Sequence, residues 1–120
     1  GVGKYLKEKN EKIKIIGIEP ESSPVITKGI SASHKIQGIG ANFIPKNLDL
    51  SVCDEIVTVS NENALSMGNT VAKNEGLLIG ISSGAAVSAA VEIAIKEKDK
   101  NIVVLLPDGG EKYLSTEMYK

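Results

Sequence analysis

The stretch LLIGISSGAA, residues 77–86, contains a strand signal followed directly by a helix signal. Leu77 to Ile81 is apolar apart from one glycine, which is typical of a buried strand. The residues that follow are rich in Ala and Val and predict a helix from about Gly84 to Lys96. A buried strand that leads straight into a helix is typical of α/β proteins.

The same alternation extends to both sides of this stretch. Further strands are predicted at 13–19, 55–59 and 101–106, and further helices at 1–7 and from Ser60 to Gly76. Short apolar strands separated by helices predict an α/β fold of three layers with a mostly parallel sheet. The segment from Glu21 to Asp54 is a long connection, and its apolar residues argue against disorder: Ile36, Ile39, Phe43 and Ile44.

Composition narrows the class of protein. The 120 residues carry a net charge of −1 with lysine as their only strong base, so nothing indicates binding to nucleic acid or to an anionic membrane. One cysteine and one histidine cannot build a disulfide framework or a four-ligand zinc site, and we expect a cytoplasmic protein. Because the first residues already have helical spacing and no initiating Met, we expect a piece of a larger protein.

Three segments at the predicted carboxyl ends of strands carry small polar or glycine residues: 20–23, 82–84 and 108–111. Ligands bind at that edge of open parallel sheets. Ser82 or Ser83 could face a ligand at the positive end of a helix, or could only cap that helix while Gly84 lets it pack on the sheet. Asp108 could pair with a cationic group or could hold a turn.

The glycine-rich loop from His34 to Asn42 allows two interpretations. Its small residues would let the backbone approach a ligand closely, or the loop is a connection that binds nothing. His34 could act as a general base, although a single histidine in a loop is more often simply exposed.

Read together, six blocks resemble the C-terminal portion of the cysteine synthases, also called O-acetylserine sulfhydrylases, which belong to fold type II of the pyridoxal-phosphate enzymes. The blocks are GVGKYLK (1–7), IGIEP (16–20), HKIQGIGA (34–41), FIP (43–45), GLLIGISSGAA (76–86) and GEKYLST (110–116). Their shared order makes the resemblance specific.

The resemblance implies that residues 1–120 form an incomplete large C-terminal domain that takes part in binding pyridoxal 5'-phosphate. The lysine that forms a Schiff base with the cofactor, the substrate loop that contains asparagine and the phosphate loop have no counterpart in this chain. No catalytic residue is therefore assigned within it.

Site residues follow from the same resemblance. Ser82 matches the serine that hydrogen-bonds the pyridine nitrogen, and Pro107 and Asp108 match the segment beside the ring. The loop at the mouth of the cleft, near the substrate, comprises Gln37, Gly38, Ile39, Gly40 and Asn42. Three positions depart from common family forms, namely Asn42, Gly109 and Lys112. A side chain at Asn42 could change which nucleophile enters.

The implied activity of the intact protein is a transferase reaction of cysteine biosynthesis. It forms L-cysteine from O-acetyl-L-serine and sulfide by β-replacement. The alternatives are a β-eliminating or different-nucleophile relative (cysteine desulfhydrase, lanthionine or cystathionine synthase), or a fragment that does not catalyse. The resemblance also implies a homodimer and allows docking of a serine acetyltransferase.

Overall fold

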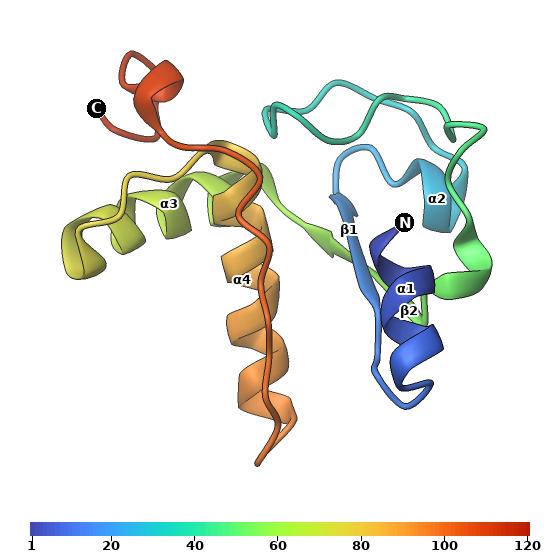
Figure 1. The fold of residues 1–120 in the computed structure, drawn as a ribbon. Helices are drawn as coiled ribbons and strands as arrows, with labels where there is room; N and C mark the ends of the chain where they lie inside the picture. Colours follow the sequence, from blue (N-terminus) through green and yellow to red (C-terminus); the bar gives the residue numbers. More distant parts are fainter.

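The computed structural model describes all 120 residues and contains a small parallel sheet with four helices. Strands β1 (Ile16–Pro20) and β2 (Glu55–Val59) pair in parallel, with Ile16 opposite Glu55 and Pro20 opposite Val59. The helices are α1 (Val2–Lys9), α2 (Val25–Lys28), α3 (Asn61–Glu75) and α4 (Ile81–Lys96), and short 3-10 turns lie at Leu50–Val52 and Glu111–Tyr113. The chain therefore has an α/β fold, with the sheet, α1 and α2 on one side of α4 and α3 on the other (Figure 1).

Local signals in the sequence account for α3 and α4. The hydroxyl of Ser60 accepts a hydrogen bond from the Asn63 amide and caps α3, and Gly76 ends α3 in the left-handed conformation, as predicted. Helix α4 begins three residues before the predicted Gly84. Its N-cap is Gly80, which has no side chain, so neither Ser82 nor Ser83 caps the helix.

The prediction that residues 77–81 form a strand of a parallel sheet is wrong. Ile79 instead forms an isolated antiparallel bridge with Gly109, held by one hydrogen bond from Gly80 to Asp108 and one from Gly110 to Leu78, both 3.0 Å. On the other side of this segment, the Tyr119 hydroxyl accepts from the amide of Ile79 at 3.1 Å and donates to its carbonyl at 2.5 Å. The turn at 108–110 and the Tyr119 side chain thus provide the hydrogen bonds that neighbouring strands would otherwise provide.

The predicted strand at 101–106 does not form either. Residues 97–107 run back beside α4 without a hydrogen-bonded strand neighbour (Figure 1). Val103 and Leu105 are 95% and 73% exposed. The apolar pattern indicates a segment suited to burial, but a strand also needs a partner for its backbone groups, and this chain supplies none here.

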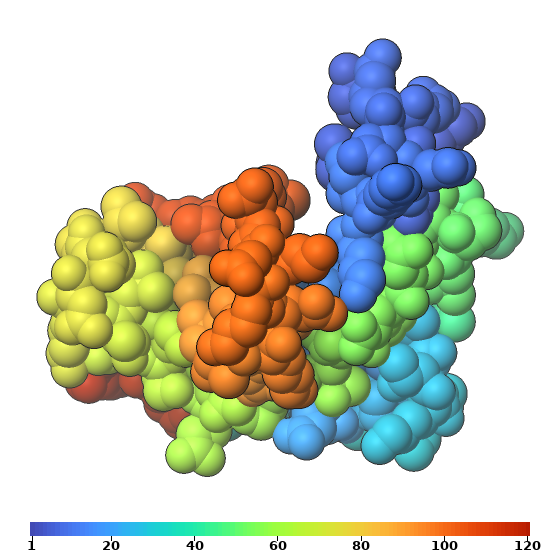
Figure 2. Space-filling model, turned by 90° about the horizontal axis from the view of Figure 1, so that it is seen from below, coloured from blue at the N-terminus to red at the C-terminus, as the bar shows by residue number.

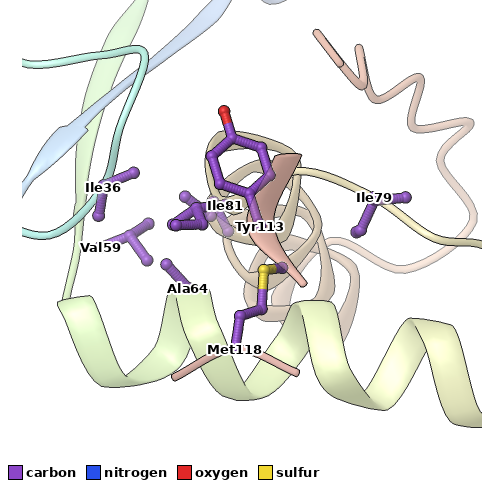
Figure 3. Close-up of a cluster of buried hydrophobic side chains, with 9 residues drawn as sticks. Ile36, Val59, Ala64, Ile79, Ile81, Tyr113 and Met118 are labelled. Carbon is purple, nitrogen blue, oxygen red and sulfur yellow. The ribbon is translucent and has the colours of Figure 1, made fainter. Parts of the chain in front are cut away.

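Two glycines allow close packing at α3: Gly84 lets α4 approach it, and Gly68 makes room for Met118. A Cβ at Gly84 would overlap the backbone carbonyl oxygen of Ala64, so Gly84 lets α4 pack on α3 and not on the sheet as expected. A Cβ at Gly68 would overlap the terminal methyl of Met118. The buried apolar cluster forms around this crossing (Figure 3) and comprises Ile36, Val59, Ala64, Ile79, Ile81, Ala85, Ala89, Tyr113 and Met118.

The accessible surface of the chain, one face of which Figure 2 shows, is large for its mass. It measures 7929 Å², whereas a globular protein of 12.7 kDa exposes about 6,200 Å². Apolar side chains contribute to the excess, including Val2 and Tyr5 on α1 and Ile95 on α4. None of the helices combines the length and apolar character needed to cross a bilayer.

We expect Gly84→Ala to destabilise the protein by about 1–3 kcal/mol, because the new methyl group meets backbone that cannot move without separating the two helices. The matched control is Gly68→Ala, which has the same gain in helix propensity of ~1 kcal/mol but meets the flexible end of Met118. Thermal unfolding of both variants measures the difference. A melting temperature for Gly84→Ala at or above that of Gly68→Ala would contradict this account of the crossing.

Candidate functional site

The two serines in the first turn of α4 have different surroundings. Both are buried, at 6% exposure for Ser82 and 0% for Ser83. The Ser83 hydroxyl donates to the Asp108 carbonyl at 3.1 Å, and the Gly80 amide donates to the same oxygen. The Ser82 hydroxyl takes part in none of the hydrogen bonds of the chain. Ser83 therefore anchors the segment after residue 106, while Ser82 is free to bind a ligand at the positive end of the helix.

The glycine-rich loop lies against Ser82. Ile36 is fully buried beside Val59 and Ile81, which fixes the loop to the start of α4 (Figure 3). Two residues later, Gly38 has φ +99°, and a Cβ built on it would lie 3.5 Å from the Ser82 oxygen. The turn at 37–40 and the Ser82 hydroxyl therefore share one side of the α4 terminus.

Buried polar groups order the long connection after β1. The Glu19 carboxylate accepts from the amides of Ile26 and Thr27 at 2.8 and 3.0 Å, which holds the short helix α2. The Ser23 hydroxyl donates to the side-chain oxygen of Asn42 at 2.8 Å and accepts from the Ala32 amide. These hydrogen bonds hold Asn42 at φ 63°, a left-handed conformation that asparagine tolerates.

The apolar residues expected to order this connection divide into two pairs. Ile36 is buried, and Ile39 packs against the buried cluster. Phe43 and Ile44 are 64% and 47% exposed, so they do not anchor the loop within this chain. Apolar burial therefore orders only the first of the two pairs.

Asp108 pairs with a lysine and also stabilises the C-terminal turn through Tyr113, so both interpretations of this residue describe contacts that it makes. Its Oδ2 accepts the Tyr113 hydroxyl at 2.8 Å and pairs with Lys112 Nζ at 3.2 Å. The hydrogen bond to this carboxylate, with burial of the ring, raises the pKa of Tyr113, and the same carboxylate raises the pKa of Lys112. Its Oδ1 is buried without a partner against Gly80, where any Cβ would overlap it.

The structure brings Gly38, Ser82 and Asp108 to the head of α4. Gln37 and Pro107 are exposed, and Asn42 is tied to Ser23. His34 is half-buried and hydrogen-bonded through both ring nitrogens, so the interpretation of it as an exposed loop residue is wrong.

Sequence reasoning missed the anchoring roles of Glu19, Ser83 and Tyr113. Ser83 could not be distinguished from Ser82 because the two are adjacent and identical. The one available signal for Tyr113 was its place just after the sharp Asp108–Gly110 turn, which returns the chain toward the carboxylate.

Known proteins match this chain along nearly its whole length. A family model described as pyridoxal-phosphate dependent enzyme matches residues 1–108. The cysteine synthase B of Campylobacter jejuni is 55% identical over 119 residues, which are 99% of this chain and 40% of that protein. The chain thus spans about 40% of the length of this curated relative.

Solved structures share the fold. A crystal structure of the cysteine synthase of Entamoeba histolytica superposes with a TM-score of 0.94 at 42% identity, covering 98% of this chain and 36% of that one. A hydrogen sulfide-producing enzyme of Fusobacterium nucleatum superposes with a TM-score of 0.89 at 42% identity, covering 93% of this chain and 39% of that one.

Replacing Asp108 by Asn should lower the pKa of Tyr113 toward the ordinary tyrosine value of about 10, because the charged acceptor that holds its proton is lost. In the parent protein, the raised pKa contributes stability that is complete below the ordinary tyrosine pKa and is lost as pH rises through the raised value. Titration of the tyrosine ring carbons by NMR, assigned with Tyr113→Phe, measures this pKa. Asp99→Asn, in an exposed turn, is the control, and an unchanged Tyr113 curve in Asp108→Asn would refute the assignment.

Proposed function

Because this chain belongs to the family of pyridoxal-phosphate dependent enzymes, we propose that it is the C-terminal part of a cysteine synthase. The intact protein would form L-cysteine from O-acetyl-L-serine and sulfide by β-replacement. The observation that carries this proposal is the free hydroxyl of Ser82 at the head of α4, beside the glycine turn, in a chain that is more than half identical to a cysteine synthase.

Within that protein, residues 1–120 would be an incomplete large domain of three layers with a mostly parallel sheet. The apolar segment at 102–106 supports this, because it lies exposed beside α4 and lacks only a hydrogen-bonded neighbour to become a strand. The lysine that holds the cofactor would lie in another part of the protein, so no side chain of this chain is assigned a covalent role.

The residues at the α4 terminus fit a bound pyridine ring. Ser82 offers a neutral hydroxyl with no other partner, and Gly38 leaves the space beside that hydroxyl without a side chain. When bound, pyridoxal 5'-phosphate supplies an electron sink for the bond changes at the substrate's Cα and Cβ.

Ser82 would set the strength of that sink. Its hydroxyl would donate to the ring nitrogen without placing a negative charge beside it, whereas a carboxylate would favour a protonated nitrogen. A ring nitrogen left mostly unprotonated gives a weaker sink, which suits loss of a leaving group from Cβ. Pro107 and Asp108 would lie beside the ring, where Ser83 and Gly80 fix the Asp108 carbonyl and the unpaired Oδ1 could accept from a donor.

Gln37, Gly38, Ile39, Gly40 and Asn42 would form the mouth of the site, where substrate enters. The exposed side chain of Gln37 and the backbone of the turn are the groups available there. The proposal also includes a homodimer and docking of a serine acetyltransferase. Both are inferred from the family alone.

A second candidate is a relative that eliminates or uses another nucleophile, such as a cysteine desulfhydrase or a lanthionine or cystathionine synthase. The observation that favours it is the similarity to the hydrogen sulfide-producing enzyme, together with a side chain at Asn42, whose amide group is held by Ser23 near the turn. A catalytically inactive fragment is the remaining alternative.

The deciding measurement compares two reactions of the full-length protein that carries this chain. We expect faster formation of cysteine from O-acetylserine and sulfide than release of sulfide from cysteine alone. Faster release of sulfide from cysteine would support the second candidate. Absence of both activities in a protein that retains the cofactor would refute the proposal.

Ser82→Ala should weaken cofactor retention by the ~0.5–1.5 kcal/mol of one hydrogen bond, and Ser82→Asp should slow β-replacement because the carboxylate favours the protonated ring nitrogen. The measurements are cofactor dissociation, the visible spectrum and the rate of cysteine formation. Ser88→Ala is the control, since Ser88 is also buried in α4 but lies six residues farther along the helix. Parental spectra and rates in both Ser82 variants would leave Ser82 without a role in cofactor binding.

A further inference from the structure

The two ring nitrogens of His34 have different hydrogen-bond partners, and these fix the tautomer. Nδ1 lies 3.2 Å from the Ile36 amide, which can only donate, so Nδ1 is the acceptor. Nε2 lies 2.8 Å from the Gly40 carbonyl oxygen, which can only accept, so Nε2 carries the proton. The ring is therefore neutral and both nitrogens are occupied, which leaves no free lone pair for a general base.

The His34 ring also lies in close contact with the loop that it bonds. A Cβ built on Gly40 would stand 2.5 Å from Nε2 and 2.7 Å from Cγ of Pro20, the last residue of β1. Gly40 has φ +63° as well. Only glycine therefore fits between the ring and the end of the strand, and the hydrogen bond ties residue 40 back to His34 at the start of the same loop.

The turn held in this way is the one that faces Ser82. Residue 36 is fixed by burial and residue 40 by the imidazole, and a Cβ built on Gly38 between them would lie 3.5 Å from the Ser82 oxygen. Release of the Gly40 carbonyl would leave the turn held by the apolar contacts of Ile36 and Ile39 and, beyond the turn, by the Ser23–Asn42 hydrogen bond, with no bond at residue 40 itself. Gly38, whose positive φ costs glycine little, would then be held less firmly in this position.

We propose that His34 is a positioning residue that holds the turn at 37–40 against Ser82 through its Nε2 proton, and thereby sets the affinity for the amino-acid substrate. The proposal rests on the proposed function, because it assumes that substrate binds beside this turn. In this role His34 acts through its hydrogen bonds to the loop backbone, and the proposal assigns it no contact with substrate or cofactor.

Three substitutions in the full-length protein separate the two hydrogen bonds. His34→Gln places an amide nitrogen where Nε2 lies and keeps a donor for Gly40. His34→Asn is the matched control, since it places an amide oxygen near Nδ1, keeps the acceptor for Ile36 and loses the donor. His34→Ala loses both. The KM for O-acetylserine should rise roughly three- to tenfold in His34→Asn and His34→Ala, which is the equivalent of one hydrogen bond. In His34→Gln it should rise less than about twofold. The kcat should change by less than about twofold in all three variants.

Hydrogen exchange gives a second readout that does not depend on activity. The amides of 37–42 should exchange faster in the Asn and Ala variants and at the parental rate in Gln. Should His34→Ala fail to fold, the comparison of Gln with Asn still decides. Equal KM values and equal exchange in Gln and Asn would overturn the proposal. A parent protein that makes no cysteine while exchange follows this pattern would refute the proposed function and leave the His34 hydrogen bond established.

Discussion

The close approach of α4 to α3 at Gly84 is the constraint on which the rest of the structure depends. The absence of a side chain there lets the backbone of α4 lie against the Ala64 carbonyl, and this contact fixes the distance between α4 and α3. Ser82 and Ser83 lie within one turn of that contact, so their positions follow from it. The buried cluster at the crossing includes Ile36, so the same contact also places the start of the glycine-rich loop.

Around this crossing, individual polar side chains stabilise, by hydrogen bonds, segments that do not pair with a β-strand. Glu19, Ser23 and His34 each bond two or more backbone or side-chain groups of the connection after β1. Asp108 does the same for the C-terminal turn. Each group is at least half-buried, where a polar atom that loses its partner is costly, so each substitution should loosen a whole segment and not one contact.

Elements defined by local chemistry could be predicted from the sequence, and elements that need a distant partner could not. The Ser60 cap and the Gly76 stop bound α3 as expected, and β2 lies at the predicted residues because β1 is present to pair with it. The apolar pattern of 101–106 is as strong as that of β2, yet no strand forms. For the candidate site, the resemblance points to Ser82 and Gly38, but their proximity and the hydrogen bonds of Ser83 and His34 depend on tertiary geometry that one sequence does not contain.

The position of Tyr119 bears on how the segment at 77–80 can accept neighbours. One edge of this segment is bonded to the turn at 108–110, and on the other edge the Tyr119 hydroxyl satisfies both backbone groups of Ile79. An incoming strand at that edge must first displace the phenol. The C-terminal tail therefore occupies the same donor and acceptor that strand addition would need, so this edge is covered against β-pairing with another chain.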